Sequence, residues 1–282
     1  MTRQVEPSAG APSAPDGRDP PLPVSPAGGD EPRGASAVGL DDARLSGWYR
    51  EDSGELFRGV PIGADDVVVD VGCGAGVNSM FCARHGARVV AIDREAQLVH
   101  EVRARLAATG TRAHTGLVSD ANPLPLEDGM ATRVICTEVL QHLDDSRQVL
   151  AELFRIGAEG ALYLLSVPGA LQEDLQDRVL PPEYRGQPGG PLRVIGGDEF
   201  AQMVGDAGLV VVEHTSYGFF WSIWWALFWA CKVELYDPAH PVLDHWTAAW
   251  RALLEMPQGQ QLKQQLDQFM PISQVIVARK PG

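Results

Sequence analysis

The chain has 282 residues, 45% of them hydrophobic, and a formal net charge of −14 with a pI near 4.8. The length allows one large domain or two small ones. The acidic balance argues against nucleic acid or an anionic membrane surface as partner, because both attract clustered lysine and arginine. The four cysteines show no paired spacing, so we expect reduced thiols, no zinc site and a cytoplasmic protein.

Residues 1–39 are rich in proline and glycine and hold almost no aliphatic run. Such a segment buries too little apolar surface to offset its loss of conformational entropy, so we predict a disordered tail. This segment lacks the basic stretch followed by an apolar stretch that is typical of a secretory signal, so we expect none. We expect the folded part to begin near Leu40 and to include an amphipathic helix in "SGWYREDSGELFRG", Ser46 to Gly59, whose aromatic residues pack on the domain.

The first strong pattern is a strand that runs into a glycine-rich turn. "VVVDVG", Val67 to Gly72, is a continuous apolar run typical of a buried parallel strand, and "GCGAG" and a helical pattern follow it. The glycines leave the backbone open to a ligand, and the helix N-terminus directs amide N–H groups toward it. The next strand ends in Asp93, where a carboxylate can accept hydrogen bonds from a ribose diol. A nicotinamide fingerprint would need glycine in place of Val77.

Three more strands continue the alternation of strand and helix. One ends at Asp120, the next covers Arg133 to Thr137 and is followed by His142, and "GALYLLSVP" forms the fifth. This alternation predicts an α/β fold with a mostly parallel sheet. Such sheets bind ligands at the carboxyl ends of their strands. The residues expected at that edge are Gly72, Asp93, Asp120 and Glu138.

The successive motifs resemble those of a known family. "VVVDVGCGAG", "VVAID", "SDANPLPLEDG" and "ICTEVLQHLDD" are similar to motifs of the class I S-adenosylmethionine-dependent methyltransferases, in the small-molecule branch called methyltransferase type 11. The likeness is close over Asp65 to Pro168 and looser beyond. It implies a Rossmann-like, seven-stranded, mostly parallel sheet whose last strand, "SQVIVARKP", is antiparallel.

The resemblance also implies S-adenosylmethionine as cofactor. It places Asp70 and the glycine loop around the amino-acid portion of the cofactor, Asp93 at the ribose hydroxyls, and Asp120 with Ala121 at the adenine edge. Residues 40–64 would form a lid over the cofactor. The cofactor-binding residues that the resemblance implies are Tyr49, Asp70, Gly72, Cys73, Gly74, Gly76, Asp93, Arg94, Asp120, Ala121 and Thr137.

The stretch after the fourth strand holds the catalytic candidate. His142 is a general base near the transferred methyl group or a residue that caps the following helix. Some relatives bind a divalent metal with a second acidic residue in this stretch, where the present chain has Gln141. We therefore expect no metal site. The relatives' "FD" ahead of the fourth strand is Ala131 and Thr132 here, which predicts a local structural difference only.

A long insertion separates the last two strands. Residues 218–271 lie between the strands Leu209–Tyr217 and Ile272–Arg279, and they hold every tryptophan of the chain except Trp48. "GFFWSIWWALFWAC" would make about 21 Å of helix, too short for the 30 Å of a bilayer core, so no membrane span is expected. A helix that is apolar on every side must be covered on every side. Its cover is core packing, an apolar acceptor pocket, a homodimer seam through 218–250 or, least favoured, a membrane surface.

These observations predict an enzyme that methylates a small, fairly apolar metabolite of secondary metabolism, with oxygen as the favoured acceptor atom. Methylation at carbon of an alkene or aromatic ring is the alternative, because aromatic walls stabilise developing positive charge. A hypothesis of another class is a non-catalytic protein that binds the cofactor and uses its aromatic segment as a partner interface. A protein methyltransferase fits less well, since a peptide acceptor needs an open groove.

Overall fold

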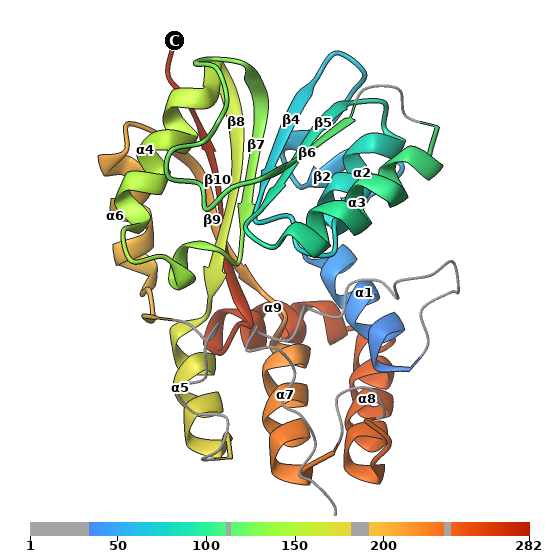
Figure 1. Cartoon of the computed structure of the whole chain (residues 1–282). Coiled ribbons are helices and arrows are strands. Elements are labelled where there is room, and N and C mark those ends of the chain that lie inside the picture. Colours follow the sequence, from blue (N-terminus) through green and yellow to red (C-terminus); the bar gives the residue numbers. More distant parts are fainter. Residues whose placement is uncertain (1–33, 111–113, 182–191, 234–237) are drawn as a thin grey trace, which may run out of the picture.

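The computed structural model describes residues 34–110, 114–181, 192–233 and 238–282 (Figure 1). The strands are β1 (Trp48–Arg50), β2 (Glu55–Phe57), β3 (Val60–Pro61), β4 (Val67–Val71), β5 (Arg88–Asp93), β6 (His114–Val118), β7 (Ala131–Thr137), β8 (Gly157–Pro168), β9 (Val210–Tyr217) and β10 (Ser273–Arg279). The helices are α1 (Ala35–Leu45), α2 (Val77–Arg84), α3 (Ala96–Ala108), α4 (Ser146–Ile156), α5 (Ala170–Val179), α6 (Gly197–Asp206), α7 (Phe219–Cys231), α8 (Pro241–Leu254), α9 (Gly259–Phe269) and the 3-10 helix η1 (Leu140–His142).

Seven strands form the main sheet in the order β6-β5-β4-β7-β8-β10-β9. The pairs among β6, β5, β4, β7 and β8 are parallel, whereas β10 runs antiparallel to both β8 and β9. The order reverses between β4 and β7, so the loops after these strands open a crevice at the carboxyl edge. The predicted mostly parallel sheet with an antiparallel last strand is confirmed.

Helices cover both faces of this sheet because consecutive residues of each strand point to opposite sides. Val68 belongs to the apolar core under α2 and α3, whereas its neighbour Val69 belongs to the core under α4 and α6. Both valines are fully buried. The continuous apolar runs of the sequence follow from this double burial.

The N-terminal region differs from the prediction in two ways. α1 begins at Ala35, inside the segment that was predicted to be disordered, while residues 1–33 lie outside the described residues. Val38 and Gly39 are buried, and a Cβ on Gly39 would lie 2.1 Å from the Trp221 ring, so the aromatic helix α7 gives α1 its partner. The expected helix in Ser46–Gly59 is instead a three-stranded antiparallel sheet, β1-β2-β3.

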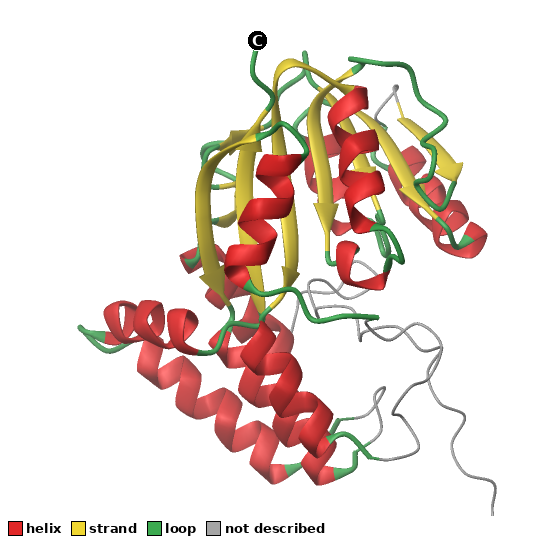
Figure 2. Cartoon of the chain, turned by 90° about the vertical axis from the view of Figure 1, so that its left-hand side faces the viewer, coloured by secondary structure: helices red, strands yellow, loops and turns green. Residues whose placement is uncertain are grey.

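α5, α7 and α8 extend away from the carboxyl edge of the sheet, and α9 lies across their upper ends (Figures 1 and 2). α7, α8 and α9 come from the predicted insertion; α5 and α9 were not predicted. Most of the α7 aromatics are buried in the core shared with α1 and α8, and the Trp246 Nε1 of α8 donates to the Phe220 carbonyl at 3.0 Å. Core packing therefore covers much of α7. Among the described residues, no helix has the length and apolarity that crossing a membrane requires.

A buried ion network joins these helices to α1. The ammonium of Lys263 in α9 lies 2.5 Å from Asp267 and 3.4 Å from Asp42 of α1, and it donates to Ser46 Oγ at 2.7 Å. Trp250 Nε1 donates to the other Asp42 oxygen at 2.8 Å. Burial raises the pKa of Asp42 to about 6 although Lys263 opposes the shift. Since the three charged side chains are nearly inaccessible, Lys263 provides the compensating charge for both carboxylates.

Candidate functional site

The glycine loop after β4 takes a left-handed backbone at each of its three glycines. Gly72, Gly74 and Gly76 have φ values of 70°, 49° and 76°. A Cβ at Gly72 would lie 2.1 Å from Val139, and one at Gly76 would lie 2.7 Å from Val102, whereas Gly74 has nothing within 4 Å of that position. The first and third glycines therefore permit close packing, and the open space at the second lets a ligand approach the backbone.

Asp93 at the tip of β5 holds this loop. Its Oδ2 accepts from Gly74 N at 2.9 Å and its Oδ1 from Glu95 N at 3.0 Å. Each carboxylate oxygen has a second lone pair, so the side chain can still accept from a ribose hydroxyl. The next residue, Arg94, is exposed beside Glu95. Asp93 thus lies where the sequence predicted it, and its contact with a cofactor stays a prediction.

Asp70 and Cys73 lie beneath the loop. Asp70 is 1% exposed and accepts from Ser79 Oγ at 2.6 Å, which fixes α2 against β4. Burial raises the pKa of Asp70 to about 6 and also raises the pKa of the Cys73 thiol. Both side chains therefore support the loop from behind, and the thiol stays protonated.

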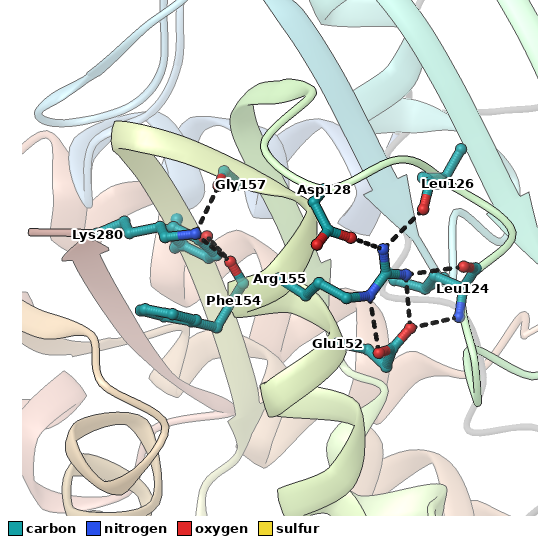
Figure 3. A network of polar contacts seen from close by, with 9 residues as sticks. Leu124, Leu126, Asp128, Glu152, Phe154, Arg155, Gly157 and Lys280 are labelled. Carbon is teal, nitrogen blue, oxygen red and sulfur yellow. Dashed lines mark hydrogen bonds and ion pairs between the residues drawn. The ribbon is translucent and has the colours of Figure 1, made fainter. Parts of the chain in front are cut away.

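Asp120 and Ala121 lie just beyond β6, at the start of a loop that α4 fixes in place. The Arg155 guanidinium donates to the carbonyls of Leu124 and Leu126 at 2.9 and 2.8 Å (Figure 3). Further bonds join Arg155 to Glu152 and Asp128, and Glu152 accepts from Leu124 N. This network holds the loop that would bound the adenine edge.

A chain of hydrogen bonds crosses from the N-terminal sheet to β7. Tyr49 OH donates to Asn78 Oδ1 at 3.0 Å, and Asn78 Nδ2 donates to Thr137 Oγ1 at 3.1 Å. Two of these three residues, Tyr49 and Thr137, were predicted from the resemblance. These hydrogen bonds bring the N-terminal segment next to the first turn of α2, where Gly76 provides no side-chain cap for the helix N–H groups. That free N-terminus can receive an anionic group.

Glu138 follows Thr137 and accepts from Ser166 Oγ at 2.7 Å. Burial raises the pKa of the Tyr217 phenol well above its usual range, and the nearby negative charge of Glu138 and the Tyr49 hydroxyl add to this shift. Tyr49, Ala121 and Glu138 have positive φ values. Side chains rarely adopt this backbone conformation, and such residues cluster at functional sites.

His142 lies in η1, beyond the β7 tip. Its Nε2 is 3.1 Å from Gln141 Nε2, and Gln141 is 1% exposed. His142 is half-buried. Within the described ranges, no three His, Cys, Asp or Glu side chains come together as metal ligands.

Sequence reasoning missed Asn78, Ser166 and Tyr217 as site residues. Asn78 lies in the helix after the glycine loop, and its link to Tyr49 spans 29 positions. Tyr217 ends β9 and packs on Trp48, with ring centroids 5.5 Å apart. Its position at a strand end was the available signal, but the antiparallel β10 had to be placed first to show that β9 ends at the carboxyl edge.

Known proteins resemble this chain in sequence and in fold. A family model described as "Methyltransferase domain" matches residues 69–165. A probable S-adenosylmethionine-dependent methyltransferase of Mycolicibacterium smegmatis is 33% identical over 104 residues, 37% of this chain and 38% of that protein. A malonyl-acyl-carrier-protein O-methyltransferase of Serratia marcescens is 33% identical over 108 residues, 38% of this chain and 40% of that protein. The solved structure of a geranyl diphosphate methyltransferase has a TM-score of 0.54 at 14% identity and covers 78% of this chain and 74% of its own.

The sheet order and the solved structure define the class I methyltransferase fold. Residues 69–165 match a methyltransferase family model and resemble S-adenosylmethionine-dependent methyltransferases, in agreement with the family predicted from the motifs. The chain spans about two fifths of the length of the curated relatives described above. The family match ends within β8, so it does not cover α5, α7, α8 or α9.

Proposed function

We propose that the chain binds S-adenosylmethionine at the carboxyl edge of the sheet and transfers its methyl group to an oxygen atom of a small, fairly apolar acceptor. The glycine loop supports this most strongly, because its backbone is packed from below at Gly72 and Gly76 and open at Gly74. The loop belongs to the segment that matches the methyltransferase family.

The residues present fit this cofactor. The space at Gly74 admits a ligand to the backbone, the uncapped N-terminus of α2 suits a carboxylate, and the Asp93 carboxylate suits a ribose diol. Tyr49 closes the site from the N-terminal sheet through its bond to Asn78. When bound, S-adenosylmethionine supplies an electrophilic sulfonium methyl group.

The protein's contribution is to align the acceptor oxygen with the methyl group at about 3 Å and to exclude water. A hydroxyl acceptor must lose its proton, and His142 is the residue that we assign to receive it. Its place in η1, directly after the β7 tip, supports this role. Glu138 stays hydrogen-bonded to Ser166 and orders the same tip.

Methylation at carbon is a second candidate, favoured by the aromatic side chains near the β7 tip. Trp48 packs on Tyr49 and on Tyr217, with ring centroids 5.6 and 5.5 Å apart. Aromatic faces stabilise a cation that develops on an alkene or ring as it accepts a methyl group. This chemistry requires a proton acceptor only after the methyl transfer.

The test uses S-adenosylmethionine labelled in its methyl group, incubated with the purified protein and a lysate of the organism that encodes it. We expect label in the organic-extractable fraction, and mass spectrometry of the labelled product identifies the atom. Label in acid-precipitable material would instead indicate a macromolecular acceptor. His142→Asn should reduce transfer to a hydroxyl by about 100-fold or more and leave S-adenosylhomocysteine binding unchanged. Unchanged transfer would contradict the role of His142.

A further inference from the structure

Two polar side chains between α5 and α7 are buried without any hydrogen-bond partner. Gln172 of α5 and Ser222 of α7 are both 0% exposed. Neither amide atom of Gln172 nor the hydroxyl of Ser222 makes a hydrogen bond with any residue that the structure describes. A buried polar group left unsatisfied costs about 1–3 kcal/mol, so each calls for an explanation.

The register of the two helices places these side chains at one level. β8 and β9 are both antiparallel to β10, so α5 and α7 both start from the carboxyl edge and run away from it. Trp229 Nε1 donates to Gln176 Oε1 at 3.2 Å across the seam. Ser273 of β10 pairs with both Pro168 and Tyr217, so the two helices start at the same level. Gln172 shares a helix face with Gln176, and Ser222 shares one with Trp229, so both lie on the seam near the start of their helices.

This level of the seam is close to the proposed methyl-transfer site. α5 begins two residues after β8, whose Ser166 holds Glu138. α7 begins two residues after Tyr217, the end of β9. Gln172 and Ser222 lie within about the first helical turn of α5 and α7, 5.4 Å along each helix, and β8 is the direct neighbour of β7 in the sheet.

The charges of the two helices define the acceptor group that fits. α7 has no charged residue, and the cation of α5, Arg178, is exposed and paired with Asp174 at 2.9 Å. Among the described residues of α5 and α7, a buried phosphate or carboxylate would find no free cation, which is very costly. A glutamine amide and a serine hydroxyl each donate and accept, so they match a neutral hydroxyl, carbonyl or amide group.

We propose that Gln172 and Ser222 form the polar recognition point of the acceptor site, and that the acceptor is an apolar molecule with an uncharged hydroxyl, carbonyl or amide group that binds between α5 and α7. This assignment rests on the proposed function and adds its substrate class. The acceptor supplies the partners that the two side chains lack within the chain. The aromatic residues of α7 contact its apolar part.

The test compares Gln172→Leu and Ser222→Ala with the control Gln176→Leu. Replacing an unsatisfied polar group by an apolar one of similar shape should leave the Tm equal or higher, whereas Gln176→Leu loses the Trp229 bond and should lower the Tm. For methyl transfer, we expect the half-saturating amount of extract to rise about tenfold or more in the first two variants and to change little in the control. Binding of S-adenosylhomocysteine should be unchanged in all three.

The probe is the organic extract of the source organism, separated on an anion exchanger into a neutral and a retained fraction. Methyl acceptance in the neutral fraction supports the proposal. Acceptance in the retained fraction alone, or unchanged half-saturation in Gln172→Leu and Ser222→Ala, overturns it and leaves the methyltransferase function intact. If no fraction accepts a methyl group, the proposed activity fails. In that case a binding measurement tests the recognition point. The neutral fraction should raise the Tm of the S-adenosylhomocysteine complex of the wild type but not that of Gln172→Leu. If the wild-type Tm does not rise, the proposal is overturned.

Discussion

Replacement of Lys263 by methionine tests the ion network that ties α9 to α1. The Lys263 side chain is 2% exposed and is shared by Asp42 and Asp267, which are 1% and 6% exposed. Methionine keeps much of the volume but leaves two buried carboxylates without a cation. Removing one partner of a buried ion pair costs about 3–5 kcal/mol, and we expect a loss in this range.

The loss should depend on pH in a defined direction. The folded-state pKa of Asp42 is about 6, raised from 3.8 mainly by burial and lowered in part by Lys263. Without Lys263 that pKa rises further, so Asp42 is protonated over a wider pH range and its uncompensated charge disappears as the pH falls. The deficit of Lys263→Met relative to wild type should therefore shrink between pH 7 and pH 5.

Urea unfolding followed by circular dichroism measures these differences. The matched control is Arg147→Met, which breaks the exposed Arg147–Asp206 pair at 2.6 Å and should cost at most about 1 kcal/mol. A Lys263→Met loss no larger than that of the control would refute the argument that burial makes this network important. A deficit that grows on acidification would refute the assigned sign.

Three further variants probe the fold and the site. Gly39→Ala should lower the free energy of unfolding in urea by about 1–3 kcal/mol, because the added Cβ would lie 2.1 Å from the Trp221 ring, which outweighs the helix preference of alanine. The control Gly205→Ala has nothing within 4 Å of the added Cβ and should stabilise the protein. Equal effects of the two substitutions would contradict the close approach of Trp221. The free energy of unfolding of Asp70→Asn should rise by about 3 kcal/mol relative to that of the wild type between pH 4 and pH 7. Burial raises the pKa of Asp70 in the folded protein to about 6 from its usual 3.8, so the wild type loses stability as the pH rises through this window. A difference in unfolding free energy that does not change with pH would contradict this. Asp93→Ala should weaken S-adenosylhomocysteine binding, measured by calorimetry, at least tenfold, because the carboxylate holds Gly74 and is the proposed acceptor for the ribose hydroxyls. Tight NADH binding by the wild type without S-adenosylhomocysteine binding would overturn the cofactor assignment.

Much of the central sheet could be predicted from local sequence. A buried parallel strand is apolar on both faces, so "VVVDVG" and "ARVVAID" were visible as β4 and β5. The glycine loop was equally visible because φ values of 49° to 76° favour glycine. The antiparallel direction of the last strand followed from the family resemblance, and the order of the strands came from the structure, since local patterns do not specify which strands pair.

Other parts depended on contacts between distant residues. α1 could not be predicted because the partner of Gly39 is Trp221 in the insertion. α9 places Lys263 and Asp267 in the interior and leaves Leu262 and Phe269 46% and 67% exposed, the reverse of the usual amphipathic pattern. Partners from distant elements make this arrangement tolerable: Asp42 and Ser46 for Lys263, and the backbone N–H groups of Gly218 and Phe219 for Asp267.

The sequence by itself determined the family, the sheet and the loop that would hold a cofactor, because those features depend on backbone conformation and burial along single strands. The tertiary structure decided what surrounds the acceptor. The alignment of α5 with α7 and the unpartnered Gln172 and Ser222 at their seam arise from helices about fifty residues apart in the chain. Their starts are aligned by the pairing of β8 and β9 with β10, which no local pattern specifies.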